Sequence, residues 1–318
     1  MEADAFLRQR EILQCTSPIN RHKGKIFAVS AVLFLSIVTW LFGWVISSVL
    51  FVVVLFHELG HLLAMRAFGY SNTSILFLPG LGALTAGEKE NSSPYQRLIV
   101  YLAGPVPGIL LSGILLYAAI YYLKLPTQPG LTAALFQSGW LSAFAIASLF
   151  FNYFNLLPVF PLDGGRVVGM LAFSRLPRGS FVFTLAGCMI FMSAALALRD
   201  TVALALGLFL AIGIPGQWDL TRVRLAMGKR EREALTEDEA AKMVFEALSQ
   251  PRFAKWPLNR RFAMTDILIT ECMERPPRVM EVLIGGCVYL LCLALPFLYS
   301  AHLLNVLELC FTVAQKKC

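Results

Sequence analysis

The sequence predicts an all-α polytopic membrane protein with about six to seven transmembrane helices. Its 318 residues are 57% apolar and only 15% charged, whereas a soluble domain carries about 25% charged residues. The charges are also unevenly spread, because residues 26–87 contain only Glu58 and Arg66 as charged side chains. Such a stretch exceeds the roughly 20 apolar residues that cross a bilayer core, so the chain is predicted to lie in a membrane.

The expected spans follow from the apolar segments of the chain. They cover residues 26–42, 45–67, 94–122, 132–157, 181–198, 201–215 and 281–300. Gly43 is the expected turn between the first two, since one upright span cannot hold so long an apolar run. The sixth segment is short, and we expect it to be tilted or packed inside the bundle.

Residues 71–90 lie between the second and third of these segments and do not read as a span. Their apolar middle is interrupted by Pro79, Gly80 and Gly82. This pattern predicts a short β-hairpin that dips into the membrane. Backbone at that depth is tolerated only where protein or a watery cavity satisfies its polar groups.

Composition divides the chain into four parts. They are an N-terminal arm (1–25), an intramembrane domain (26–216, with its core at 45–170), a small polar module (217–280) and an additional C-terminal span and tail (281–318). In the module, Thr236 and Glu239 form a capping-box sequence, which predicts the start of a helix. One face of that helix is expected to be apolar and buried. It carries Ala240, Met243, Val244, Ala247 and Leu248.

The basic residues predict the orientation of the chain. They are concentrated in the N-terminal arm, in the loop with Arg166, Arg175 and Arg178, and in residues 222–232. An orientation with the N-terminus and the 217–280 module in the cytoplasm puts all three groups on the positive side of the membrane. The net charge of +7 is dispersed, so it favours contact with anionic lipid headgroups and no nucleic-acid partner.

The second span contains HELGH, from His57 to His61. On a helix the two histidines leave the same face one turn apart. This spacing suits two nitrogen ligands of one Zn²⁺, with Glu58 beside them as the base for a water molecule. The alternative is a set of polar residues hydrogen-bonded in a bundle core. It is disfavoured because one ionisable residue at membrane depth costs about 2.5–3.5 kcal/mol.

A hydrolytic zinc site needs a third protein ligand and one open position. The remaining histidines, His22 and His302, lie in the basic arm and beyond the last span. Asp163 is the only acidic residue between Glu90 and Asp200, and it ends an apolar segment. Taken alone, an aspartate there is as readily a helix end before a basic loop. The histidine pair makes Asp163 the favoured third ligand.

Together these motifs resemble the site-2 protease family of intramembrane zinc metalloproteases. The family pattern, HExxH followed by NxxPxxPLDGG, is matched by HELGH and by NLLPVFPLDGG at residues 155–165. AGPVPG at residues 103–108 is similar to a segment that members carry between the two motifs. Its glycines and prolines are expected to allow close helix packing.

The resemblance implies a role for each matched residue. His57, His61 and Asp163 would bind one zinc ion, and Glu58 would act as the general base. Asn155 would orient the substrate or stabilise the oxyanion, with a packing role at the helix end as the open alternative. Independently of the resemblance, the hairpin is expected to hold an unwound substrate on the edge from Ile75 to Leu84 or to serve as a structural plug.

The implied function is hydrolysis of peptide bonds in membrane-spanning proteins near the cytoplasmic face. The implied substrates are single-span proteins such as membrane-tethered regulators, and the expected location is a bacterial plasma membrane. Two other functions remain open. A transporter or channel would also place polar residues in the membrane. A catalytically inactive scaffold could share the fold.

Overall fold

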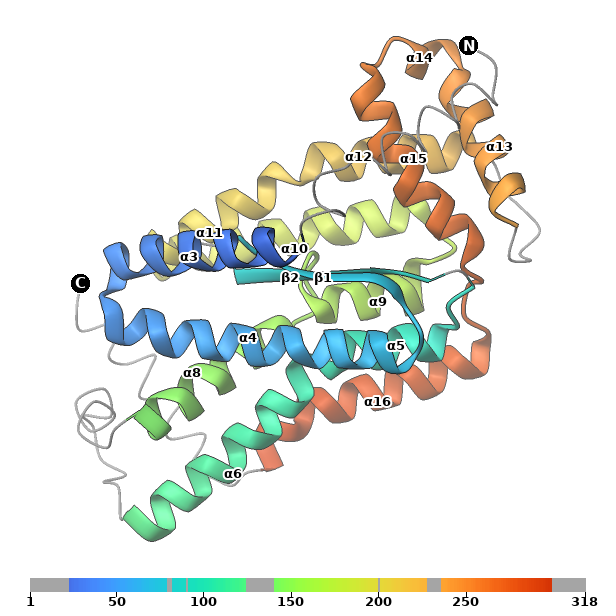
Figure 1. Ribbon diagram of the computed structural model, residues 1–318. Coiled ribbons are helices and arrows are strands. Elements are labelled where there is room, and N and C mark those ends of the chain that lie inside the picture. Colours follow the sequence, from blue (N-terminus) through green and yellow to red (C-terminus); the bar gives the residue numbers. More distant parts are fainter. Residues whose placement is uncertain are drawn as a thin grey trace.

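A computed structural model describes residues 23–78, 82–89, 91–123, 140–199, 201–227 and 236–298 (Figure 1). The N-terminal arm before residue 23, positions 79–81 of the hairpin turn and the tail after residue 298 lie outside the described residues. Positions 228–235, which carry part of the expected basic run, lie outside them as well.

The predicted fold class is confirmed: the described chain is mostly helical, and it is an integral membrane protein. Five helical stretches are long and apolar enough to cross a membrane. They are α3 (Lys23–Phe42), α4 (Trp44–Ala67), α10 (Pro177–Ala197), α16 (Val279–Leu298) and the run from α5 (Pro94–Ala103) into α6 (Pro105–Leu123). Two further expected spans contain shorter helices, the 16-residue α8 (Trp140–Asn155) and the 12-residue α11 (Thr201–Ile212).

The turn between α3 and α4 is made by Gly43, as expected. Its φ of 81° lies in the left-handed region, which glycine adopts without a steric penalty. The ring of Trp44 lies 5.6 Å from that of Trp140 at the start of α8. Half or more of each of these tryptophans is exposed. Exposed tryptophans at helix ends are typical of a membrane interface, so this end of the bundle is expected to lie at one bilayer surface.

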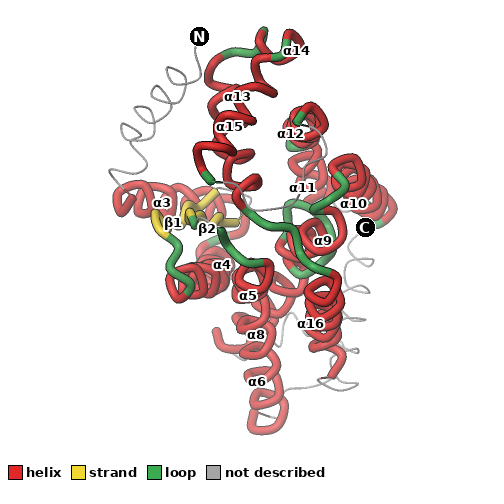
Figure 2. The backbone as a smooth tube through the Cα atoms, turned by 90° about the vertical axis from the view of Figure 1, so that its right-hand side faces the viewer, coloured by secondary structure: helices red, strands yellow, loops and turns green. Residues whose placement is uncertain are grey.

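The predicted hairpin is confirmed as β1 (Ser71–Leu78) paired antiparallel with β2 (Gly82–Glu88). Side chains alternate between its two faces, as they must along a strand. One face buries Ile75, Phe77 and Thr85 against α3 and α4, and Phe77 stacks on Phe51 of α4. The opposite face leaves Leu84 exposed. The hairpin therefore lies along the helices near the middle of the bundle (Figures 1 and 2).

The centre of the bundle is built around α8, which packs against α4 and α6. The short helix α9 (Asp163–Phe173) and the last span α16 complete this core. The Tyr289 hydroxyl of α16 donates to the Leu156 carbonyl over 2.7 Å, just after the end of α8. The last span thus supports the loop that leads from α8 to Asp163.

At one end of the bundle, short helices form a second hydrophobic cluster (Figure 1). They are α12 (Ile214–Ala226), α13 (Glu237–Ser249), α14 (Pro251–Ala254) and α15 (Leu258–Met273). The predicted capping box is confirmed, since Thr236 accepts from the Glu239 backbone and Glu239 accepts from the Thr236 backbone. The five apolar side chains expected on the inner face of α13 are all buried.

The loop after α15 connects this cluster to the bundle. Glu274 forms an ion pair with Arg97 of α5 and accepts from the Ser92 hydroxyl over 3.0 Å. Arg97 also donates to the Arg275 carbonyl over 2.8 Å. Farther along the loop, Arg175 donates to the Pro277 carbonyl over 2.9 Å.

Candidate metal centre

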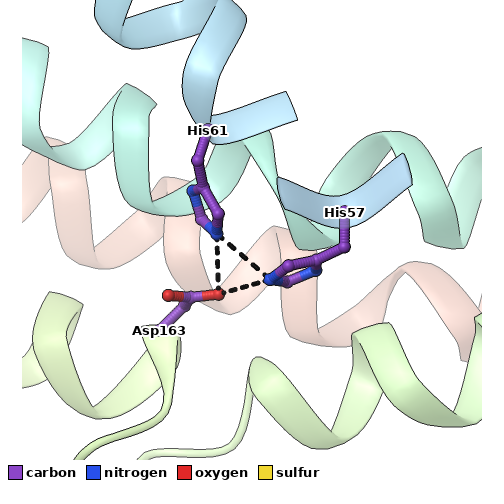
Figure 3. A group of neighbouring side chains, drawn as sticks. All are labelled: His57, His61 and Asp163. Carbon is purple, nitrogen blue, oxygen red and sulfur yellow. Dashed lines mark hydrogen bonds and ion pairs between the residues drawn. The ribbon is translucent and has the colours of Figure 1, made fainter. Parts of the chain in front are cut away.

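Helix α4 presents His57 and His61 on one face, towards the interior of the bundle (Figure 3). Both are buried, at 2% and 6% exposure. Their Nε2 atoms are 3.1 Å apart, and the two rings meet nearly edge to face. The predicted one-turn spacing of the HELGH histidines therefore brings their nitrogens to one point.

Asp163 reaches the same point from the first residue of α9. Its Oδ2 lies 3.1 Å from His57 Nε2 and 3.2 Å from His61 Nε2. The two glycines that follow allow this approach. A side-chain carbon at Gly164 would meet the Leu156 carbonyl oxygen at 2.0 Å, so only glycine lets α9 begin this close to the end of α8.

The second nitrogen of each ring is held by an acceptor. His61 Nδ1 lies 2.7 Å from the Val100 carbonyl oxygen. His57 Nδ1 lies 2.8 Å from Asn152 Oδ1. The Asn152 amide nitrogen donates to the Ser148 carbonyl, which fixes the amide with its oxygen towards His57. Each Nδ1 therefore carries the proton when its ring is neutral.

This tautomer turns both Nε2 lone pairs towards each other and towards the Asp163 carboxylate. With both rings neutral, three electron-rich atoms converge in a buried site and no proton lies between them. A cation resolves this repulsion. The described residues thus contain a group able to hold a metal ion, with one ligand atom from each of the three residues.

The dimensions fit zinc. Tetrahedral zinc with bonds of about 2.0–2.2 Å places neighbouring ligand atoms roughly 3.3–3.6 Å apart. The three separations here, 3.1, 3.1 and 3.2 Å, lie a few tenths of an ångström below that range, so small side-chain shifts would accommodate the ion. Two imidazoles and one carboxylate are a known catalytic zinc set, and they leave a fourth position for water.

The AGPVPG segment lies against this cluster. A side-chain carbon at Gly104 would meet His61 Nε2 at 2.3 Å, and one at Gly108 would meet the Asn152 amide at 2.2 Å. On α4, Gly60 faces the Ala103 carbonyl in the same way, at 2.0 Å. These glycines therefore allow the expected close packing: Gly104 packs against the ligand His61, and Gly108 packs against Asn152, which contacts His57.

Glu58 lies beside the ligands and is 4% exposed. Its Oε2 accepts from the Thr85 hydroxyl of β2 over 2.5 Å. The hydroxyl also lies 3.3 Å from the Glu58 backbone carbonyl. The hairpin thus contacts the proposed base itself.

Asn155, the asparagine singled out by the motif, donates to the Phe151 carbonyl of its own helix over 2.9 Å. Asn152, one turn earlier, contacts His57 instead and is fully buried. Sequence reasoning missed Asn152, Val100 and Thr85. Of these three residues, only Asn152 could have been noticed in the sequence, because it is an amide within an apolar segment, three residues before the motif.

Residues 45–134 match the model of Peptidase family M50. A Synechocystis protein, sll0528, is 35% identical over 131 residues, which cover 41% of this chain and 31% of that one. Zinc metalloprotease MJ0392 of Methanocaldococcus jannaschii is 29% identical over 155 residues, covering 48% and 41%. Stage IV sporulation protein FB of Bacillus subtilis is 28% identical over 128 residues, covering 40% of each chain.

The alignments therefore span less than half of these relatives' own length. Among solved structures, the site-2 protease from Methanocaldococcus jannaschii aligns with a TM-score of 0.44 and 22% identity, covering 65% of this chain and 91% of that one. The M50 segment contains HELGH and AGPVPG, whereas Asp163 lies beyond it. The resemblance to the site-2 protease family that the motifs predict is thus confirmed, and its family-model match runs from residue 45 to residue 134.

Proposed function

We propose that the protein is a zinc-dependent endopeptidase that cleaves single-span membrane proteins within the bilayer. The observation that carries the proposal is the convergence of two histidine lone pairs and the Asp163 carboxylate beside Glu58. Such a buried trio could hold a metal ion, and the neighbouring Glu58 carboxylate supplies the base that hydrolysis requires. The similarity to a protein named zinc metalloprotease supports the same conclusion.

The chemistry follows from the side chains. His57, His61 and Asp163 would hold a zinc ion, which would act as a Lewis acid and would lower the pKa of water at the site to about 7. Glu58 takes the proton from the attacking water and delivers it to the leaving amine as the peptide bond breaks. Asn152 and the Val100 carbonyl hold the imidazoles in the tautomer that this site requires. Asn155 is proposed to orient the substrate or its developing oxyanion.

The hairpin is proposed to bind the substrate on β2. The Phe77 backbone N–H points away from β2, because it donates to the Ser30 hydroxyl of α3. Phe77 faces Ala83 and Ile75 faces Thr85 in the register. Residues of such non-hydrogen-bonded pairs direct their backbone groups outwards on both strands. Ala83 and Thr85 therefore direct their backbone groups towards the outer edge of β2, where an unwound substrate could add as a third strand.

Strand addition has a simple test in the substrate. A proline has no backbone N–H and cannot pair with β2 at that position. We expect a proline scan along a cleaved single-span substrate to reduce cleavage at alternate positions near the scissile bond. Uniform tolerance of proline would instead favour the hairpin as a structural plug.

The orientation is also a proposal, with the N-terminus and residues 217–280 in the cytoplasm. Arg66 near the end of α4 and Arg166 in α9 belong on the positive side of the membrane. The metal site would then open towards the cytoplasm and release the cleaved regulator there. Single cysteines at positions 44 and 178, in a cysteine-free background, test this orientation. Position 44 should react with an impermeant reagent in sealed cells, and position 178 should react only after the membrane is opened.

The decisive experiment compares the wild type with Glu58→Gln. The amide matches the carboxylate in size but cannot accept the water's proton. We expect one zinc per chain in both proteins and cleavage of a single-span substrate by the wild type alone. Absence of zinc in both would favour a transporter or channel. Zinc without cleavage by the wild type would favour an inactive scaffold.

A further inference from the structure

The hairpin carries one polar side chain that reaches the metal centre. Thr85 lies on the face of β2 that packs on the helices, and it is 6% exposed. Its hydroxyl donates to Glu58 Oε2 over 2.5 Å. A carboxylate that accepts from a hydroxyl at this distance makes a charge-assisted bond, which is roughly twice as strong as a neutral one.

The same residue lies on the edge proposed to receive substrate. The Thr85 side chain points towards α4, while its backbone groups point outwards along β2. A strand added to this edge would therefore pair with the residue whose hydroxyl holds Glu58. Thr85 would then contact the substrate through its backbone and Glu58 through its hydroxyl.

We propose that Thr85 is a positioning residue that holds one oxygen of Glu58 and leaves the other for the attacking water. This assignment rests on the proposed function of the site. A free glutamate side chain has several rotamers and loses up to about 1.5–2 kcal/mol of entropy when it is fixed. The Thr85 hydroxyl fixes Glu58 before the substrate arrives, so the loss is not incurred in the transition state.

The competing explanation is that Glu58 merely provides a hydrogen-bond acceptor for the buried Thr85 hydroxyl and is not positioned by it. In that case the Glu58 carboxylate would keep its position without the hydroxyl. Thr85→Val separates the two, because valine has the same shape and a high strand propensity. Thr85→Ser keeps the hydroxyl and loses only a methyl group. Thr184→Val is a matched control, since Thr184 is a buried threonine that donates to the Ser180 carbonyl of its own helix over 3.0 Å.

The first measurement is cleavage of a single-span substrate, with kcat and KM determined separately. Thr85→Val should lower kcat by about 10- to 100-fold, the value of a hydrogen bond to a charged group, with KM within about threefold. Thr85→Ser should retain kcat within about threefold, and Thr184→Val should match the wild type. All four proteins should hold one zinc per chain.

The second measurement does not require cleavage. A small hydroxamate, acetohydroxamic acid, binds zinc and donates to the neighbouring carboxylate, so its affinity reports the placement of Glu58. Thr85→Val should weaken its binding by about tenfold, and Thr85→Ser should restore it. Equal hydroxamate affinity in the wild type and Thr85→Val would overturn the proposal, as would a serine variant as impaired as the valine variant. A wild type that binds zinc and hydroxamate without cleaving would refute the proposed function alone.

Discussion

The membrane bundle and the cluster of α12–α15 differ in the side chains that they expose. In the bundle, many large apolar side chains face outwards, and several polar groups are buried beside its apolar core. Its buried polar residues include Ser112, Ser148 and Asn152, and its exposed apolar ones include Trp40 and Ile190. In the cluster, Val244, Leu248 and Leu268 are fully buried. Charged side chains such as Lys242 and Glu246 stay at least partly exposed.

The difference reflects two solvents. Lipid tails are as apolar as leucine, so burying a leucine inside the bundle gains little. In water, each Å² of buried apolar surface contributes about 25 cal/mol to the free energy of folding, and this burial stabilises the cluster. Polar side chains inside the bundle must satisfy one another, which is how Ser148, Asn152 and His57 come to form one chain of hydrogen bonds. Substitutions in the bundle interior should therefore affect the site, and those in the cluster should affect stability.

The largest expected effect is complete loss of metal from the bundle. His61→Ala removes one of three ligands and leaves a site of two, which is insufficient for stoichiometric zinc at micromolar concentration. We expect metal analysis of the purified protein to fall from one zinc per chain towards zero. Circular dichroism should show that the helices remain. A variant that keeps one zinc per chain would contradict the ligand assignment.

The next effect should appear in the cluster. Leu248→Ala leaves a cavity in a water-driven core and should destabilise it by about 2–5 kcal/mol. The matched change in the bundle is Ile190→Ala, where 69% of the side chain is exposed on the outer surface of α10. We expect the free energy of unfolding of that variant in lipid bilayers to lie within about 1 kcal/mol of the wild-type value, because lipid replaces the lost contacts. Equal destabilisation by both changes would remove the proposed difference between the two regions.

In both regions the sequence predicts local elements better than it predicts contacts between distant segments. Apolar runs and a capping box depend on neighbours along the chain, so the long helices, the hairpin and the start of α13 could be read directly. The residues behind the metal centre depend on contacts between distant segments. Thr85 is 27 positions from Glu58, and Asn152 is 95 positions from His57. No local pattern encodes such pairs, and the motif drew attention to Asn155 instead of Asn152.

Asn152 offers the third test, within the bundle. Asn152→Leu keeps the size of the side chain and removes the acceptor for His57 Nδ1. Loss of such a support typically reduces metal affinity by 10- to 100-fold, and we expect that range for zinc by chelator competition. Asn152→Asp retains an acceptor and should stay near the wild type. Asn155→Leu should leave zinc affinity unchanged, since Asn155 bonds only within its own helix among the contacts described. Equal weakening by both leucine variants would indicate a general effect on α8.

The smallest effect should arise where the two regions meet, at Glu274. Burial raises the pKa of its carboxyl above the ordinary value, against the opposing influence of Arg97. A carboxyl with a raised pKa in the folded state favours folding most when protonated, so its contribution is fully present below the unfolded pKa of about 4.5 and is lost as the pH rises through the folded pKa. At neutral pH, Glu274→Gln should change the free energy of unfolding by about 1 kcal/mol.

The sign of the pH dependence is the sharper part of this last prediction. As the pH falls from 7 towards 4.5, the wild type should gain stability relative to Glu274→Gln in thermal unfolding. An ordinary exposed ion pair would show the reverse, because protonation of its carboxylate breaks it. Glu246→Gln is a control, since this glutamate lies in α13, away from the bundle contact that Glu274 makes. A loss of wild-type stability relative to Glu274→Gln on acidification would mean that attraction to Arg97 outweighs burial. The contact between the regions would then behave as an ordinary ion pair between Glu274 and Arg97 and not as a desolvated link.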